Sequence, residues 1–225
     1  MATSQTALKQ FLARDTVTVA RDLLGCQLRY QTAQGVLAGY IVETEAYLGQ
    51  QDQAAHAYAG RRTKSNQALY AAAGTIYIYS IYGQFLLNVI TQAVNVPQGV
   101  LIRGLEPCFG QNIMAAHRGL TATTPQLTNG PGKLMQALGI QDLTLNETLY
   151  NTGTLSLDCQ QRRWPQRIAT SGRIGVPHKA KWTTAPLRFY VAGNAYVSKI
   201  AKRDCQSNQG WRQDDMKNEG QYGMD

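Results

Sequence analysis

Apolar residues fall in short runs along this chain, and turn-forming residues separate one run from the next. The run VTVARDLL (17–24) carries apolar side chains at helical spacing. Asp15 or Thr16 is available as its N-cap, and Gly25 has the position of a C′ glycine. We therefore expect a short helix over 17–24.

The next runs have the character of β-strands. The segments CQLRYQ (26–31) and VLAGYIVETE (36–45) flank the turn formers TAQG, which predicts a β-hairpin. Further strands are expected at 75–79, 85–90, 100–105, 155–159 and 187–191, and helices at 109–117 and 132–138. Strands outnumber long helices, and no regular alternation of strand and helix is present. The pattern favours a mostly antiparallel α+β fold in a single compact domain.

Length and composition fit that expectation. The chain has 225 residues, 44% of them hydrophobic and 16% charged, which is typical of one globular domain. No apolar run approaches the roughly 20 residues of a membrane span. The N-terminal segment MATSQTALKQFLARD lacks the features of a secretory signal, so we expect neither membrane insertion nor export. Residues 204–225 are polar and unpatterned, which predicts a flexible tail after a domain over 1–203.

The four cysteines, Cys26, Cys108, Cys159 and Cys205, are far apart and form no CxxC pair. Neither a zinc site nor a small disulfide scaffold is therefore expected, and a reducing compartment fits best.

Charge indicates what the protein binds. The formal net charge is +8 and the pI is about 9.4. No acidic residue lies between Asp158 and Asp204. That interval contains Arg162, Arg163, Arg167, Arg173, Lys179, Lys181, Arg188, Lys199, Lys202 and Arg203. Such a stretch is either a solvated basic face or, as we favour, a surface that binds a phosphate backbone.

Two carboxylates end the second strand of the predicted hairpin. Glu43 and Glu45 are two residues apart, so in a strand they share a face and repel each other when both are ionised. They could form a glycosidase-like pair, although such pairs come from separate segments. We expect a structural role for Glu43. Glu45, near the strand end and close to Tyr47, is either the residue that carries out the chemistry or a partner in a surface salt bridge.

Aromatic residues follow in the segment TIYIYSIYG. Tyr77 and Tyr79 share a strand face, and Tyr82 precedes Gly83 in an expected turn. Core packing explains one or two of these side chains. A tyrosine at a turn of a basic protein can also stack on a nucleobase or enter a base stack. His56 alone is more often structural than catalytic.

The segment NGPGKLMQALG (129–139) places small residues and Lys133 at an expected helix start, which suits a phosphate or a plain helix cap. It lacks the spacing of a nucleotide P-loop.

In this order, VETEAYLG, AAH, GTIYIYSIYG, LLNV, VLIRGLEP, GPGKL, RIGVPH and PLRFYV resemble the alkyladenine (3-methyladenine) DNA glycosylase family over residues 23–198. The resemblance implies a curved antiparallel sheet with flanking helices, similar to the C-terminal domain of methionyl-tRNA formyltransferase. It also implies a monomer that needs no metal or other cofactor.

The resemblance also assigns roles to residues. Glu45 matches the general base that activates a water, Arg103 a residue that helps hold Glu45 and that water, and the Ile174 carbonyl a third contact of the water. Tyr47, His56 and Tyr79 match the walls of a base pocket, to whose shape Leu69 contributes. Tyr82 matches a wedge in the DNA duplex. Asn88 matches a residue that crowds the 2-amino group of guanine, although the stretch from Tyr82 to Asn88 is one residue shorter here. We expect Lys133, Arg61, Arg62 and Arg173 to contact the DNA backbone.

The expected activity is that of a monofunctional DNA glycosylase acting on double-stranded DNA that contains damaged purines. Its substrates would be 3-methyladenine, 7-methylguanine, hypoxanthine and ethenoadenine, flipped out of the duplex before hydrolysis. It would be cytoplasmic and near the nucleoid in a bacterium, or nuclear in a eukaryote. Two other readings remain: an RNA- or tRNA-binding module without catalysis, and a carbohydrate hydrolase that uses Glu43 and Glu45.

Overall fold

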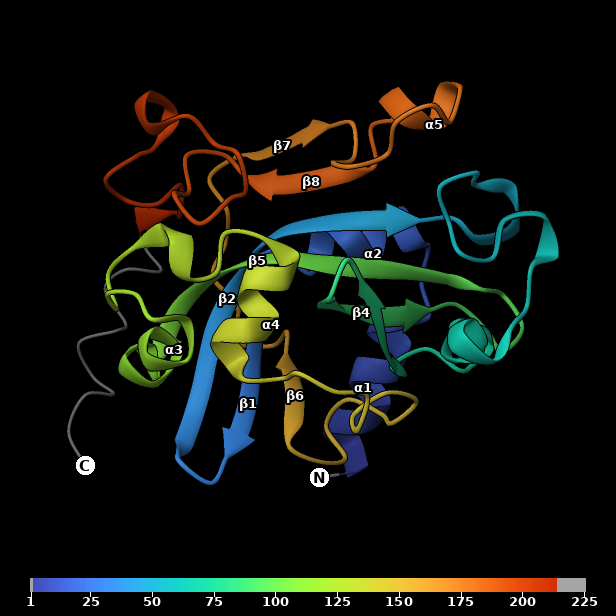
Figure 1. The fold of residues 1–225 in the computed structure, drawn as a ribbon, viewed down its shortest axis with the longest axis horizontal. Coiled ribbons are helices and arrows are strands. Elements are labelled where there is room, and N and C mark those ends of the chain that lie inside the picture. The colour runs from blue at the N-terminus through green and yellow to red at the C-terminus, as the bar shows by residue number, and fades with distance from the viewer. Residues whose placement is uncertain (1, 214–225) are drawn as a thin grey trace.

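An antiparallel sheet runs through the middle of the molecule (Figure 1). The structure, a computed structural model, describes residues 2–213. Its strands are β1 (Gln27–Thr32), β2 (Gly35–Tyr47), β3 (Ile76–Ile81), β4 (Gln84–Thr91), β5 (Gln98–Phe109), β6 (Leu155–Asp158), β7 (Ile168–Ser171) and β8 (Arg188–Val191). Every strand pair in the described residues is antiparallel. The single α+β domain expected from the sequence is confirmed, whereas the likeness to the formyltransferase domain stays a prediction.

The long strand β2 organises the sheet. The strand order is β3-β4-β5-β2-β1-β6, and β8 with its partner β7 also joins at β2. β1 pairs with the first half of β2, and β8 pairs with the second half at 43–45. β5 lies along the other side of β2, with register shifts around 41–44. The second half of β2 therefore has a strand on each side, and this buries both of its glutamates.

Helices cover both faces of this sheet. They are α1 (Ala2–Leu12), α2 (Thr16–Asp22), α3 (Gln111–Arg118), α4 (Pro131–Leu138) and α5 (Lys181–Thr184). Figure 1 shows α4 in front of the sheet and α2 behind it. Asp15 caps α2 by accepting the Thr18 N–H at 2.8 Å. Short 3₁₀ turns occupy Gly49–Gln51, Tyr58–Gly60, Lys64–Tyr70, Pro125–Leu127 and Lys202–Asp204.

The main core lies between the sheet and these helices, and a smaller apolar cluster supports the region between β2 and β3. Leu69, Tyr70, Tyr77 and Ile90 belong to this smaller cluster, together with two alanines, and Tyr79 packs against it. The cluster attaches the segment between β2 and β3 to the strands β3 and β4, and so positions one wall of the cavity described below.

The local predictions agree with this fold. The helix at 17–24, the hairpin at 26–45, the later strands and the helix at 132–138 are confirmed to within a few residues. Residue 109 ends β5 instead of starting the predicted helix at 109–117, because Gly110 adopts a left-handed conformation (φ 73°) before α3 begins. The sequence did not indicate α1, α5 or β7.

The prediction of a loose tail from 204 onward is wrong for residues 204–213. Trp211 is 1% exposed, and its indole N–H donates to Glu106 Oε2 at 2.7 Å. The Gln166 N–H donates to the Gly210 carbonyl at 2.8 Å. One buried indole outweighs the polar composition around it and holds this segment on the domain. The rest of the predicted tail, 214–225, lies outside the described residues.

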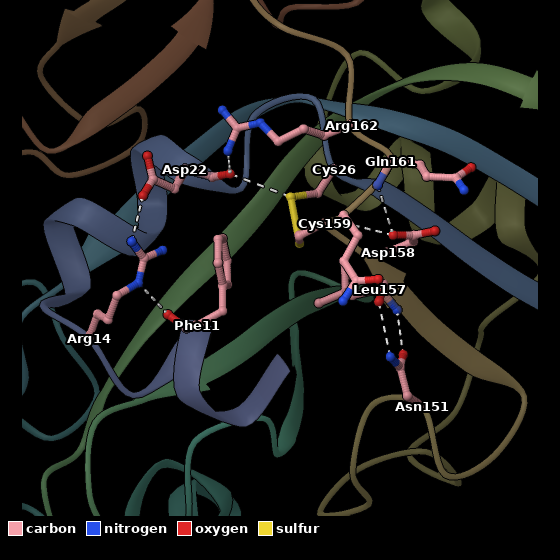
Figure 2. The surroundings of a disulfide bond; sticks show 11 residues. Phe11, Arg14, Asp22, Cys26, Asn151, Leu157, Asp158, Cys159, Gln161 and Arg162 are labelled. Carbon is pink, nitrogen blue, oxygen red and sulfur yellow. Dashed lines mark hydrogen bonds and ion pairs between the residues drawn. A yellow bond between two sulfur atoms is a disulfide. The ribbon is translucent and has the colours of Figure 1, made fainter. Parts of the chain in front are cut away.

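Cys26 and Cys159 form a disulfide across a sequence separation of 133 residues (Figure 2). It joins the residue before β1 to the residue after β6, two strands that pair with each other. Cys108 and Cys205 are free. The wide spacing of the cysteines gave no sign of this pairing, and a disulfide is unusual in the reducing compartment expected from the sequence.

Candidate active site

A cavity of about 300 Å³ opens beside the C-terminal end of β2. Its walls come from the end of β2, residues 54–56, the β3–β4 hairpin, β5 and residues 174–176. Its wall includes Arg103, Tyr82 and every residue expected in the base pocket, namely Tyr47, His56, Leu69, Tyr79, Asn88 and Ile174. This volume is at the lower end of the range for small-ligand sites.

The Glu45 carboxylate lies directly behind this wall. Glu45 is 0% exposed. The Tyr47 hydroxyl donates to its Oε2 at 2.9 Å, the Ile174 N–H donates to its Oε1 at 2.7 Å, and Arg103 Nη1 is 3.3 Å from Oε1. All three partners line the cavity, so a water reaches the carboxylate only if one of them moves.

These surroundings make Glu45 a stronger base than an exposed glutamate. Burial raises the pKa of its carboxyl, and the nearby charge of Glu43 raises it further. Arg103, the Ile174 N–H and the Tyr47 hydroxyl oppose this effect without cancelling it. A carboxylate of raised pKa that remains hydrogen-bonded in its ionised form suits general base catalysis.

Glu43 has a different environment, although it shares a face of β2 with Glu45. Like Glu45, it is 0% exposed and behind the cavity wall, but only Arg103 among its partners lines the cavity, whereas Tyr47, Arg103 and Ile174 around Glu45 all do. Burial alone would raise its pKa, but Arg103, Arg188 and the Ser198 N–H lower it overall. Glu43 is thus an ionised group inside a charge cluster. The carbohydrate hydrolase hypothesis therefore lacks the second catalytic carboxylate that it requires.

Aromatic rings form a large part of the cavity wall. The rings of His56 and Tyr79 meet edge to face with centroids 4.5 Å apart, and Tyr77 and Tyr79 are 5.4 Å apart. Burial raises the pKa of Tyr79 to about 12, and the charge of Glu45 adds to the effect. The guanidinium of Arg173 lies 4.6 Å from the Tyr47 ring and supports it.

The surroundings of His56 favour the neutral imidazole. Burial lowers its pKa, and the positive charge of Arg61 lowers it further. Its Nδ1 is 2.8 Å from the Tyr77 hydroxyl. If that hydroxyl donates to Nδ1, the proton of the neutral ring is on Nε2. A hydrogen-bond donor is then available on a ring of the cavity wall.

Tyr82 is at the tip of the β3–β4 hairpin and is 97% exposed. Ile81 pairs with Gln84, so Tyr82 and Gly83 alone form the loop. Both have positive φ, 50° and 73°, as a type I′ turn requires. Glycine adopts this conformation freely, but a bulky side chain does so under strain. The chain therefore holds an aromatic side chain in solvent beside the cavity at a cost in backbone energy.

Comparison with known proteins shows to which family this chain belongs. The model of the methylpurine-DNA glycosylase (MPG) family matches residues 10–195. The chain belongs to this family.

Its relatives include bacterial proteins assigned as 3-methyladenine DNA glycosylases. One from Lactiplantibacillus plantarum is 50% identical over 92% of this chain and 98% of its own length. One from Latilactobacillus sakei is 49% identical over 94% of this chain and 100% of its own length. One from Staphylococcus saprophyticus is 46% identical over 90% of this chain and 98% of its own length.

Two further pocket residues expected in this glycosylase family are buried. Asn88 is 6% exposed, and its Nδ2 donates to the Tyr77 carbonyl at 3.1 Å. That bond fixes the amide orientation, and the amide contributes to the cavity wall. Leu69, also 6% exposed, contributes apolar surface to the wall.

The four basic residues expected at the DNA backbone divide into two groups. Arg61 and Arg62 are exposed, and Lys133 is half-buried with its Nζ donating to Asn129 Oδ1 at 2.8 Å. Arg173 differs from the expectation. Its guanidinium is buried and donates to Asp52 through Nη1 at 2.5 Å and Nη2 at 2.8 Å, so its charge is used inside the protein.

Asp52 is a site residue that the sequence did not reveal. Besides binding Arg173, it accepts the N–H groups of Leu48 and Ala54 at 3.1 and 3.0 Å. It therefore ties the wall after β2 to the segment that carries the Ile174 N–H. The only signal in the sequence was its place two residues before the AAH motif.

No group of three or more metal-binding side chains occurs among the described residues. Within 2–213, no helix is both long and apolar enough to cross a bilayer.

Proposed function

We propose that this protein is a monofunctional DNA glycosylase that hydrolyses the N-glycosidic bond of alkylated or deaminated purines in duplex DNA. One observation carries this proposal. The carboxylate of Glu45, whose pKa is raised, lies behind a cavity lined by aromatic rings, and the exposed Tyr82 is part of the wall of that cavity. The proposed products are a free base and an abasic site. Bacterial relatives make the cytoplasm, near the nucleoid, the expected location.

Recognition begins with removal of the damaged nucleotide from the stack. Flipping costs a few kcal/mol, and less for damaged or mispaired bases. Tyr82 would enter the vacated position, because its ring is fully presented to solvent next to the cavity. Arg61, Arg62 and Lys133 would contact backbone phosphates without regard to sequence.

The pocket favours damaged purines by charge and shape. Purines such as 3-methyladenine and 7-methylguanine are cationic, and each contact with a tyrosine ring attracts a cation by about 0.5 to 2 kcal/mol. Tyr47 and Tyr79 supply such rings, and a neutral His56 adds no repelling charge. For neutral lesions such as hypoxanthine and ethenoadenine, discrimination would come from fit and from hydrogen bonds to His56. Asn88 would crowd the 2-amino group of guanine.

Glu45 would act as the general base. It takes one proton from a water, the water oxygen bonds to C1′ of the sugar, and the base leaves with the electrons of the glycosidic bond. The ionised carboxylate also stabilises the positive charge that develops on the sugar. Before this step, the Tyr47 hydroxyl must leave Oε2 so that water can approach. Stacking of the base on the Tyr47 ring would favour that movement.

The described residues that line the cavity include no lysine. An amine nucleophile is therefore not at hand for a Schiff base, which supports base release without strand cleavage.

A duplex with one hypoxanthine tests the proposal. The wild-type protein should release free base and leave an alkali-labile abasic site, whereas Glu45→Gln should bind the same duplex without releasing base. Binding by the wild type with no release after long incubation would support a nucleic-acid-binding module instead. Release by Glu45→Gln at the wild-type rate would remove Glu45 from the mechanism.

A further inference from the structure

Glu43 is fully buried, does not contact the cavity, and is nevertheless surrounded by four donors. Its Oε1 accepts Arg103 Nε at 2.9 Å, Arg188 Nε at 2.6 Å and the Ser198 hydroxyl at 2.7 Å. Its Oε2 accepts the Ser198 N–H at 2.7 Å. A group with this many charge-assisted contacts is fixed in place.

Arg103 connects this group to Glu45. Its Nε donates to Glu43, and its Nη2 donates to the Ser198 hydroxyl at 3.4 Å. Its third nitrogen, Nη1, lies 3.3 Å from Glu45 Oε1. The guanidinium therefore contacts Glu45 through Nη1, where an arginine without other partners would bind both carboxylate oxygens through two nitrogens.

We propose that Glu43 is a positioning residue for Glu45: by binding Arg103 through Nε, it prevents that guanidinium from pairing fully with Glu45. Glu45 Oε2 then stays clear of the guanidinium, and a water can bind there once the Tyr47 hydroxyl leaves it. This role rests on the proposed function of Glu45 as general base.

Charge balance supports the same role. Glu43, Glu45, Arg103 and Arg188 form a cluster of two carboxylates and two guanidiniums. Without Glu43, the cluster carries a net positive charge, and Glu45 is the nearest acceptor to which Arg103 can turn. Both effects make Glu45 a weaker base.

The groups that face Glu45 from each neighbouring element are known. Glu43 and Tyr47 come from β2, Arg103 from β5 and Tyr79 from β3. The Ile174 N–H comes from the loop after β7, and Arg188 is the register partner of Glu45 on β8, although its guanidinium binds Glu43. Of these, Arg103 is the cation in contact with Glu45, and its charge is the strongest influence that opposes the effect of burial on the pKa of Glu45.

The test uses single-turnover release of hypoxanthine by the full chain as a function of pH. Glu43→Gln should lower the rate at pH 7 by about 10- to 100-fold, because a misplaced catalytic group costs up to about 100-fold. The acid limb of the profile should move to lower pH, and affinity for an abasic-analogue duplex should not change. Ser198→Ala loosens Arg103 without removing a charge. It should also lower the rate at pH 7 and move the acid limb to lower pH, by smaller amounts than Glu43→Gln.

Glu106→Gln is the matched control. Glu106 on β5 also pairs with an arginine, Arg163 Nη1 at 2.8 Å, but it lies outside the cavity wall. This variant should lose stability and keep the wild-type acid limb. A folded Glu43→Gln with the wild-type rate and acid limb overturns the inference, and so does an acid limb that moves to higher pH. If Glu43→Gln does not fold, Ser198→Ala decides by the same criteria. Base release by Glu45→Gln at the wild-type rate would instead remove the general base on which this inference rests, and no release by the wild type would refute the proposed function.

Discussion

Replacing Tyr82 by asparagine should make the protein more stable and less able to hold a flipped nucleotide. Tyr82 has φ 50° in a two-residue hairpin loop and is 97% exposed. Asparagine tolerates this backbone conformation, and Asn-Gly is a preferred sequence for such a turn. The substitution therefore separates the strain of the turn from the use of the ring.

The stability change follows from two terms. The left-handed conformation costs an ordinary residue roughly 1 to 2 kcal/mol, and asparagine recovers part of this. Loss of the ring costs almost nothing in packing, because the side chain contacts little protein when 97% of it is exposed. The net gain is about 1 kcal/mol, which raises Tm by about 2 to 4 °C in a protein of this size.

The functional change has the opposite sign. Stacking of a base on an aromatic side chain is worth about 1 to 3 kcal/mol, which corresponds to roughly a 5- to 150-fold weaker hold on the flipped state. Thermal unfolding gives the first quantity, and a fluorescent base analogue beside the lesion gives the second. Tyr82→Phe is the control, since it keeps both the ring and the strain.

Either measurement can refute this reasoning. A lower Tm for Tyr82→Asn would show that the ring stabilises the free protein through contacts that its exposure does not indicate. An unchanged flipping equilibrium in a variant that still binds the duplex would eliminate the wedge role.

Three other predictions concern buried groups. Because burial raises the pKa of Glu45, base release should fall as the pH drops through a value above that of an ordinary glutamate; an acid limb at the ordinary value in a single-turnover profile would contradict this. Asp52→Asn leaves the buried Arg173 charge uncompensated and should cost about 3 to 5 kcal/mol in denaturant unfolding, so an unchanged midpoint would show that the pair is not stabilising. Reduction of the Cys26–Cys159 disulfide should lower the free energy of unfolding by about 2 to 4 kcal/mol. Base release should not change, because neither cysteine lines the cavity. As a control, the free energy of unfolding of Cys159→Ser should not change when reductant is added.

The parts of the fold that the sequence predicted depend on neighbours along the chain. Asp15 caps the helix at 17–24 through an N–H three residues away, and the hairpin at 26–45 closes through adjacent turn residues. The resemblance to a glycosylase family likewise located the cavity residues, because each of its motifs is a short segment around one functional side chain.

The structural features that the sequence did not predict depend on contacts between residues that are far apart in the sequence. Cys26 and Cys159 are 133 residues apart, and Asp52 binds an arginine 121 residues further along. Trp211 is buried against Glu106 on β5, which no pattern within its polar segment indicates. Local patterns show which residue types are present, but only the folded chain shows which of them meet.

The basic stretch between Asp158 and Asp204 shows that a count of basic residues overstates the charge available to bind DNA. Arg163, Arg173 and Arg188 are 8%, 5% and 8% exposed. They pair with Glu106, Asp52 and Glu43, three acids that precede the stretch in the sequence. These arginines neutralise carboxylates that the fold buries, and two of those carboxylates support the site around Glu45. Only the exposed cations of the stretch can displace counterions from DNA, so the salt dependence of duplex binding should be weaker than the number of basic residues in this stretch implies.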